Sequence, residues 1–278
     1  MINSRIVLVV ATHAEAQPLI QHFKMQPECS KPFALYIGGA GSAETSSATD
    51  GRSISLLVTG LGSPNAMMAV SWCAGYLPDP MIWLNVGVAG GGDKDIGDLY
   101  WVNKVEGIPL TRAVYPFALI KSTLATDSIR TLEKPSHEYE EGLFDMESAG
   151  FFAAATKFAR FEFVQALKIV SDNSRQSLAA LDKQLISSLI SSNINQIDDF
   201  VTKLVACSAI EGEQEVLSVF NNLRCTKSQE RLINEALRKL ALFGADHEET
   251  ERTIQDAQSA KDLLHDLQDK VAGLAPSY

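Results

Sequence analysis

The sequence predicts an α/β sandwich with a mixed or parallel central sheet, followed by a helical C-terminal extension. Short, almost continuously apolar segments such as Phe161–Val170 are typical of strands that are covered on both faces. These segments alternate with helical patterns, which favours the α/β class. After Ser174 no further strand pattern occurs, and the apolar residues repeat at helical spacing instead.

Strands are expected where β-branched and apolar residues stand between turn residues. In chain order they are Arg5–Val10, Leu35–Ile37, Ser53–Thr59, Met81–Leu84, Asp98–Val105, Ser122–Ile129 and Phe161–Val170. Helices are expected where apolar residues recur every three or four positions. Those among the strands are Ala16–Phe23, Asn65–Gly75 and Ser148–Phe158. Loops are expected at Gly38–Gly51, which is rich in Gly, Ser and Ala, and at the charged segment Glu133–Glu141.

The glycine-rich stretch Met81–Gly92, MIWLNVGVAGGG, is the centre of the interpretation. Its first four residues form a buried strand, and Asn85–Gly92 is expected as a short turn. Because glycine has no Cβ, such a turn brings backbone N–H groups close to a ligand. The carboxyl end of a parallel strand is also where open α/β sheets bind small molecules. A tight turn that needs positive φ is the simpler alternative.

The C-terminal part is expected to be helical throughout. Leu181–Val205 is amphipathic, and Gly244–Asp246 interrupts the charged helical region that follows. Further apolar stripes are Leu217, Phe220 and Leu223; Leu232, Ile233, Leu237 and Leu240; and Ala257, Ala260, Leu264, Leu267, Val271 and Leu274. The last stripe has the three-then-four spacing of an antiparallel hairpin or coiled-coil seam. We therefore expect an α/β domain over residues 1–206 and a helical extension over 207–278, which either covers the core or binds a partner.

Composition restricts the function. The chain has 278 residues, 46% of them hydrophobic and 21% charged, and its net charge is -10. This charge argues against a nucleic-acid or acidic-membrane partner. No apolar run reaches the roughly 18 residues of a membrane span, and Ile6–Val10 is too short for a signal sequence. We expect a cytoplasmic protein with a small-molecule ligand.

The cysteines are scattered along the chain, with no CxxC spacing and no nearby histidine pair. They are Cys29, Cys73, Cys207 and Cys225. Reduced thiols are expected rather than a metal site or a disulfide framework.

Four acidic residues fall at expected sheet edges: Glu15, Asp145, Glu147 and Asp172. Each of them alone could cap a helix N-terminus. However, an expected strand precedes each of Glu15, the glycine-rich turn, Glu147 and Asp172. They could therefore lie together at one edge of the sheet, around one binding site.

Five pieces of the sequence resemble the nucleoside phosphorylase/nucleosidase superfamily, in particular its methylthioadenosine/S-adenosylhomocysteine nucleosidases and futalosine hydrolases. The pieces are Ala11-Thr12 leading to Glu15, Thr59–Gly62, Asn85–Gly91, Phe144–Ala149 and Ile169–Asp172. They occur in the family order, and the resemblance extends over roughly Arg5 to Leu204. The resemblance implies a three-layer sandwich with a central mixed sheet. It also implies a homodimer that uses no cofactor or metal and hydrolyses the N-glycosidic bond of a purine nucleoside.

The resemblance also implies roles for individual residues. Asp172 is the general acid that protonates the leaving base, supported by Ser171. Glu147 accepts hydrogen bonds from the two ribose hydroxyls, and Met146 packs on the sugar. Glu15 positions and deprotonates the attacking water. A base leaves easily only when it is protonated, so a buried carboxyl group suits the role of acid.

Gly87, Val88, Ala89 and Asp145 complete the expected substrate-binding set. Two of them depart from the family pattern: Val88 stands where many relatives have serine, and Asp145 replaces glutamate. The segment between Val105 and Thr123 also looks shorter than in relatives. These departures bear on which substrate is bound and not on the fold.

Hydrolysis and phosphorolysis differ in the anion site. Phosphorylases of this superfamily hold phosphate with an N-terminal Gly-Asp-Pro turn and arginines, whereas this chain has Ala-Thr-His-Ala-Glu. Arg52 and Arg112 are not at the matching positions, and Glu15 would repel phosphate. Hydrolysis is favoured. A phosphorylase and a catalytically inactive nucleoside-sensing module remain alternatives; a dinucleotide-binding fold lacks its G-x-G-x-x-G fingerprint.

Overall fold

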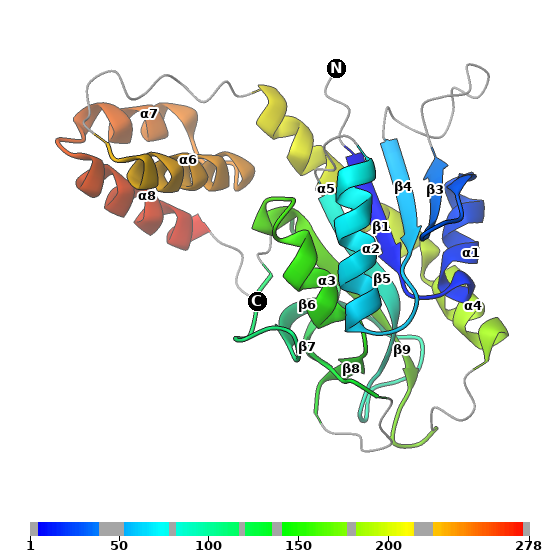
Figure 1. The fold of residues 1–278 in the computed structure, drawn as a ribbon. Helices are drawn as coiled ribbons and strands as arrows, with labels where there is room; N and C mark the ends of the chain where they lie inside the picture. Colours follow the sequence, from blue (N-terminus) through cyan, green and yellow to red (C-terminus); the bar gives the residue numbers. More distant parts are fainter. Residues whose placement is uncertain are drawn as a thin grey trace. The chain divides into compact units, whose positions relative to one another are not determined.

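The computed structural model describes residues 5–38, 53–77, 82–116, 120–134, 141–176, 182–213 and 225–274. The chain forms two compact units, the first extending to Val205 and the second beginning at Ala206. Figure 1 shows the elements of both. No helix in the described ranges is long and apolar enough to cross a membrane.

A nine-stranded mixed sheet forms the centre of the first unit. Its strands are β1 (Arg5–Val10), β2 (Gln26–Cys29), β3 (Ala34–Gly38), β4 (Ser53–Val58), β5 (Ile82–Gly90), β6 (Leu99–Glu106), β7 (Ala125–Thr131), β8 (Leu143–Asp145) and β9 (Val164–Asp172). Their order is β2-β3-β4-β1-β5-β8-β7-β6-β9, and β9 also pairs with β5. Strands β1, β4, β5 and β9 run parallel, whereas β6 is antiparallel to β9. The expected mixed sheet is confirmed.

Helices cover both faces of this sheet. They are α1 (His13–His22), α2 (Ser63–Tyr76), α3 (Ser148–Ala155), α4 (Lys183–Ser192) and α5 (Ile194–Glu213), with a short 3-10 helix, η1, at Phe161–Phe163. Figure 1 shows α2 and α3 on one face, while α1 and α4 pack together on the other. The three-layer architecture that the resemblance implied is therefore confirmed.

The core of the α2–α3 face joins residues from strands and helices. Val7 and Val9 of β1 belong to one buried cluster with Val70 of α2 and Phe151 of α3. Gly150 permits the close approach of the two helices, because a Cβ at this position would lie only 2.3 Å from the backbone oxygen of Ser63.

The main correction concerns the glycine-rich stretch. Strand β5 does not end at Leu84 but continues to Gly90, so Asn85–Gly90 is extended and not part of a turn. Its continuation is explained by pairing: β9 lies alongside β5 from Trp83 to Gly90. Pairing partners far away in sequence thus override the local turn tendency of the glycines.

Other boundaries also differ from expectation. Helix α1 begins three residues early, because Thr12 caps it. Strand β9 begins only at Val164, after η1. Strands β2 and β8 were not expected, since β2 is an exposed edge containing Pro27 and β8 has only 3 residues. Most of the two expected loops lies outside the described residues, which omit 39–52 and 135–140.

The expected helix Leu181–Val205 is two helices, α4 and α5, separated by Asn193. The buried side chain of Asn193 donates to the backbone oxygens of Gly97 and Leu189, which fixes the chain at the break.

The second unit contains α6 (Lys227–Leu242), α7 (His247–Asp256) and α8 (Ala260–Leu274). Its own core comprises Ile233, Ala236, Leu240, Ala260, Leu263 and Leu267. The expected break is present: Gly244 has a φ of 71°, and Asp246 caps α7. The expected stripe Leu217, Phe220 and Leu223 lies outside the described residues.

Candidate active site

Glu15 is buried at the N-terminus of α1 and uses both carboxylate oxygens. Oε2 accepts hydrogen bonds from the backbone N–H and the hydroxyl of Thr12, at 2.7 and 3.0 Å. Oε1 accepts from the backbone N–H of Val88 in β5, at 3.1 Å. Glu15 therefore completes a capping box with Thr12 and also reaches the central strand.

Gly87 makes room for this contact. A Cβ at position 87 would lie 2.8 Å from Glu15 Oε1 and 3.5 Å from Lys168 Nζ. The glycine is thus explained by the close approach of the Glu15 carboxylate to β5 and not by a turn. Its neighbours Val88 and Ala89 are half-buried and buried on the same strand.

Glu147 lies at the N-terminus of α3, immediately after β8. Its Oε1 accepts a hydrogen bond from the backbone N–H of Gly62 at 2.7 Å. Burial, and next the charge of Asp145, raises the pKa of Glu147 to about 7, while Lys168 and the Gly62 N–H act in the opposite direction. Met146, which precedes it, is half-buried, and its backbone oxygen accepts from the Ser63 hydroxyl.

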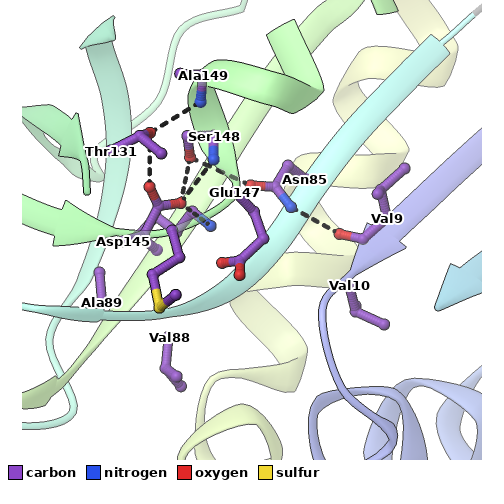
Figure 2. A network of polar contacts seen from close by, with 12 residues as sticks. Val9, Val10, Asn85, Val88, Ala89, Thr131, Asp145, Glu147, Ser148 and Ala149 are labelled. Carbon is purple, nitrogen blue, oxygen red and sulfur yellow. Dashed lines mark hydrogen bonds and ion pairs between the residues drawn. The ribbon is translucent and has the colours of Figure 1, made fainter. Parts of the chain in front are cut away.

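Asp145 is engaged by the protein itself. Its Oδ1 accepts from the Thr131 hydroxyl at 2.8 Å, and its Oδ2 accepts from the N–H and hydroxyl of Ser148 at 3.0 and 2.6 Å. Figure 2 shows the Asp145 carboxylate within this network, whereas the Glu147 carboxylate points away from it. These contacts suit a supporting role for Asp145 better than direct contact with a substrate.

Lys168 is a site residue that the sequence analysis missed. It is 1% exposed in β9, and its Nζ lies 2.9 Å from Asp145 Oδ2. Burial lowers its pKa, but the charges of Asp145, Glu147 and Glu15 outweigh this effect, and the pKa is raised. The signal was available, because the lysine stands between Leu167 and Ile169 in a mostly apolar, buried strand.

Asp172 and Ser171 end β9 and are both buried. The Ser171 hydroxyl donates to Asp172 Oδ1 at 2.7 Å and lies 3.3 Å from the Ala89 backbone oxygen. Asp172 pairs in register with Gly90 of β5. Glu15 contacts Val88 of the same strand. Glu15 and Asp172 therefore lie beside two positions of β5, Val88 and Gly90, that are about 7 Å apart.

Glu15, Asp145, Glu147 and Lys168 lie together around β5. Asp172, on β9, pairs with Gly90 of β5, two residues beyond Val88. Buried carboxylates of this kind can exchange protons with a ligand and accept its hydroxyl groups. In the described parts of the chain, no group of three His, Cys, Asp or Glu side chains has the arrangement of a metal site.

Neither a family model nor a curated protein matches this sequence. Solved structures do match, and they define the class of fold: it is that of the 5'-methylthioadenosine/S-adenosylhomocysteine nucleosidases.

Three of these structures illustrate the likeness. The Arabidopsis thaliana 5'-methylthioadenosine nucleosidase is 20% identical, covers 73% of this chain and 97% of its own, and has a TM-score of 0.59. The Campylobacter jejuni enzyme is 17% identical, with coverages of 73% and 98% and a TM-score of 0.56. The Colwellia psychrerythraea enzyme, in complex with adenine, is 14% identical, with coverages of 69% and 92% and a TM-score of 0.55. Identities this low establish the fold alone.

Proposed function

We propose that the first unit hydrolyses the N-glycosidic bond of a purine nucleoside and releases the free base. The observation that carries this proposal is the placement of Glu15, Glu147 and Asp172, all buried, at β5 and the ends of its neighbours. Helix capping does not account for the whole set, because the Glu147 side chain makes no cap hydrogen bond and Asp172 ends a strand.

Each acid has a distinct task in the proposed reaction. Glu15 takes a proton from a water molecule, whose oxygen then bonds to the anomeric carbon of the ribose. The bond from this carbon to the base breaks, and its electron pair leaves with the base. Asp172 donates a proton to the departing ring, while Glu147 accepts hydrogen bonds from the ribose hydroxyls. Such a step passes through an oxocarbenium-like sugar, which nearby carboxylates stabilise.

Water is favoured over phosphate as the nucleophile because of what surrounds Glu15. Its carboxylate occupies the N–H and hydroxyl groups of Thr12 and the N–H of Val88. Backbone N–H groups and hydroxyls of this kind are what an anion such as phosphate would bind. With the donors taken by a carboxylate, an incoming phosphate would meet negative charge instead.

The purine assignment is supported by the family resemblance and by the adenine in the structurally similar Colwellia enzyme. The scattered cysteines, with no CxxC spacing, favour reduced thiols and are consistent with a cytoplasmic protein.

We further propose that the protein is a homodimer that associates through α2. Leu61, Met68 and Tyr76 are 60%, 55% and 45% exposed, and Trp72, which stacks on Tyr76, lies between the last two. The helix Ser63–Tyr76 contains no charged residue. In a chain of net charge -10, this uncharged apolar face lets two copies meet without opposing like charges.

The test is release of free base from a panel of purine nucleosides, with and without phosphate. We expect release without phosphate, and a loss of about 100-fold or more in Glu15→Gln, because general-base assistance is removed. Glu248→Gln, an exposed acid on α7, is the matched control and should keep full activity. Release that strictly requires phosphate would replace hydrolysis by phosphorolysis, and binding without any release would favour the sensing module.

A further inference from the structure

Four ionisable side chains are buried together beside β5, and only one of them is basic. Glu15, Asp145, Glu147 and Lys168 are 3%, 7%, 7% and 1% exposed. They come from α1, the end of β8, the start of α3 and β9. Since buried charge is costly unless it is compensated, the placement of the ammonium decides which acid ionises most readily.

The ammonium is held by Asp145. Lys168 Nζ lies 2.9 Å from Asp145 Oδ2, and three further donors, from Thr131 and Ser148, fix the same carboxylate. Thr131 in turn accepts the N–H of Ala149, so the network is anchored to α3. Figure 2 shows the hydrogen bonds that join Asp145 to Thr131 and Ser148.

Glu147 receives less compensation. Its carboxylate accepts the N–H of Gly62, from the segment between β4 and α2. The charged groups acting on it are Asp145, Lys168 and Glu15, of which only Lys168 favours its ionised form. Asp145 therefore acts on Glu147 twice: it adds a negative charge nearby and keeps the ammonium at its own carboxylate.

We propose that Asp145 is a positioning residue that acts through Lys168: it holds the ammonium at its own carboxylate and so withholds this compensating charge from Glu147. This inference rests on the proposed function for its consequence, because Glu147 must be ionised to accept both ribose hydroxyls. Nucleoside binding then weakens on the acid side of neutrality, and the Asp145–Lys168 pair sets where this happens.

The direct test follows the ionisation of Glu147 in the ligand-free full-length protein. Protein labelled with ¹³C at glutamate carboxyl carbons is titrated by NMR, and the Glu147 signal is assigned by its loss in Glu147→Gln. We expect a midpoint near pH 7 in the wild type. Asp145→Asn frees the ammonium and removes a negative charge, so the midpoint should fall by about one unit or more.

The opposite shift is expected when the cation is removed. Lys168→Met should raise the Glu147 midpoint, whereas Asp145→Glu, which keeps the charge, should leave it near the wild-type value. Thr131→Val weakens the same network without changing its charge, and serves as the structural control. Circular dichroism establishes that each variant is folded, and the two charge variants provide independent tests.

The binding consequence is measured with a purine C-nucleoside, which has no N-glycosidic bond to cleave. Relative to the wild type, Asp145→Asn should bind it about 5- to 10-fold more tightly at pH 6 and equally at pH 8.5. Equal Glu147 midpoints in the wild type and Asp145→Asn, or shifts in one direction for both charge variants, would overturn the proposal. If the midpoints shift as expected but no nucleoside binds, the proposed function fails while the role of Asp145 stands.

Discussion

Glu147 is a single residue whose ionisation links stability to pH. Its pKa is raised from 4.5 to about 7, first by burial and then by Asp145. Between these values the folded protein keeps a proton that the unfolded chain has released. This stabilising contribution is complete below the unfolded pKa and is lost as the pH rises through the folded one.

The free energy of unfolding should therefore fall between pH 5 and pH 8 by an amount on the order of 1–3 kcal/mol from this group. Glu147→Gln cannot titrate and should show a smaller fall. Urea unfolding of both proteins at the two pH values measures the difference. An identical pH dependence in the two proteins would show that Glu147 has no raised pKa.

At Gly87 the backbone of β5 lies directly against the carboxylate of Glu15. Gly87→Ala places a methyl group 2.8 Å from Glu15 Oε1, so the carboxylate must move away from Val88. We expect about 100-fold slower base release, because small displacements of catalytic groups are costly. Gly273→Ala on α8 is the matched control: a Cβ there meets nothing within 4 Å, and the change should preserve activity and stabilise α8 slightly. Normal turnover in Gly87→Ala would argue against Glu15 as the base.

At the level of the elements, long apolar strands and well-capped helices are readily predicted from the sequence. Strand β1 was predicted with its observed bounds, because five consecutive aliphatic residues follow Arg5. Strand β8 could not be, since its 3 residues acquire their conformation only by pairing with β5 and β7. The glycine-rich end of β5 was misassigned for the same reason: its pairing partner β9 lies some 80 positions later.

The site shows the same division between local and distant information. Glu15, Glu147 and Asp172 were selected from short motifs, and the structure places each of them in a buried position at the sheet. Asp145 is hydrogen-bonded to Thr131 and ion-paired with Lys168, which are 14 and 23 positions away in the chain. No local sequence motif could therefore predict these contacts. The roles of Glu15, Glu147 and Asp172 in binding and catalysis remain predictions.

The close packing of α2 against α3 leads to a prediction about stability. Gly150→Ala would bring a Cβ within 2.3 Å of the Ser63 backbone oxygen, and backbone cannot yield as a flexible side chain does. We expect a loss of about 1–3 kcal/mol in the free energy of unfolding. Gly273→Ala on α8, where a Cβ has open space, is the control. Thermal denaturation of both variants measures the difference, and equal stability would contradict the close packing of the helices.

At the level of the whole molecule, the apolar face of α2 is expected to join two copies. Met68→Glu places a charge at the centre of this face and should convert the dimer to a monomer. Gln21→Glu adds the same charge to an exposed position on α1 and should leave the dimer intact. Light scattering after size-exclusion chromatography gives the mass of each. A monomeric wild type, or a dimeric Met68→Glu, would contradict association through α2.

The central claim is that three carboxylates act on one sugar to add water across its bond to the base. It is tested most directly by incubating the protein with a purine nucleoside in phosphate-free H₂¹⁸O and analysing the released sugar by mass spectrometry. We expect one ¹⁸O atom in each ribose released by the wild type, and no release by Glu15→Gln or Asp172→Asn within the same time. Ribose without the label, or unchanged release by either variant, would contradict the account.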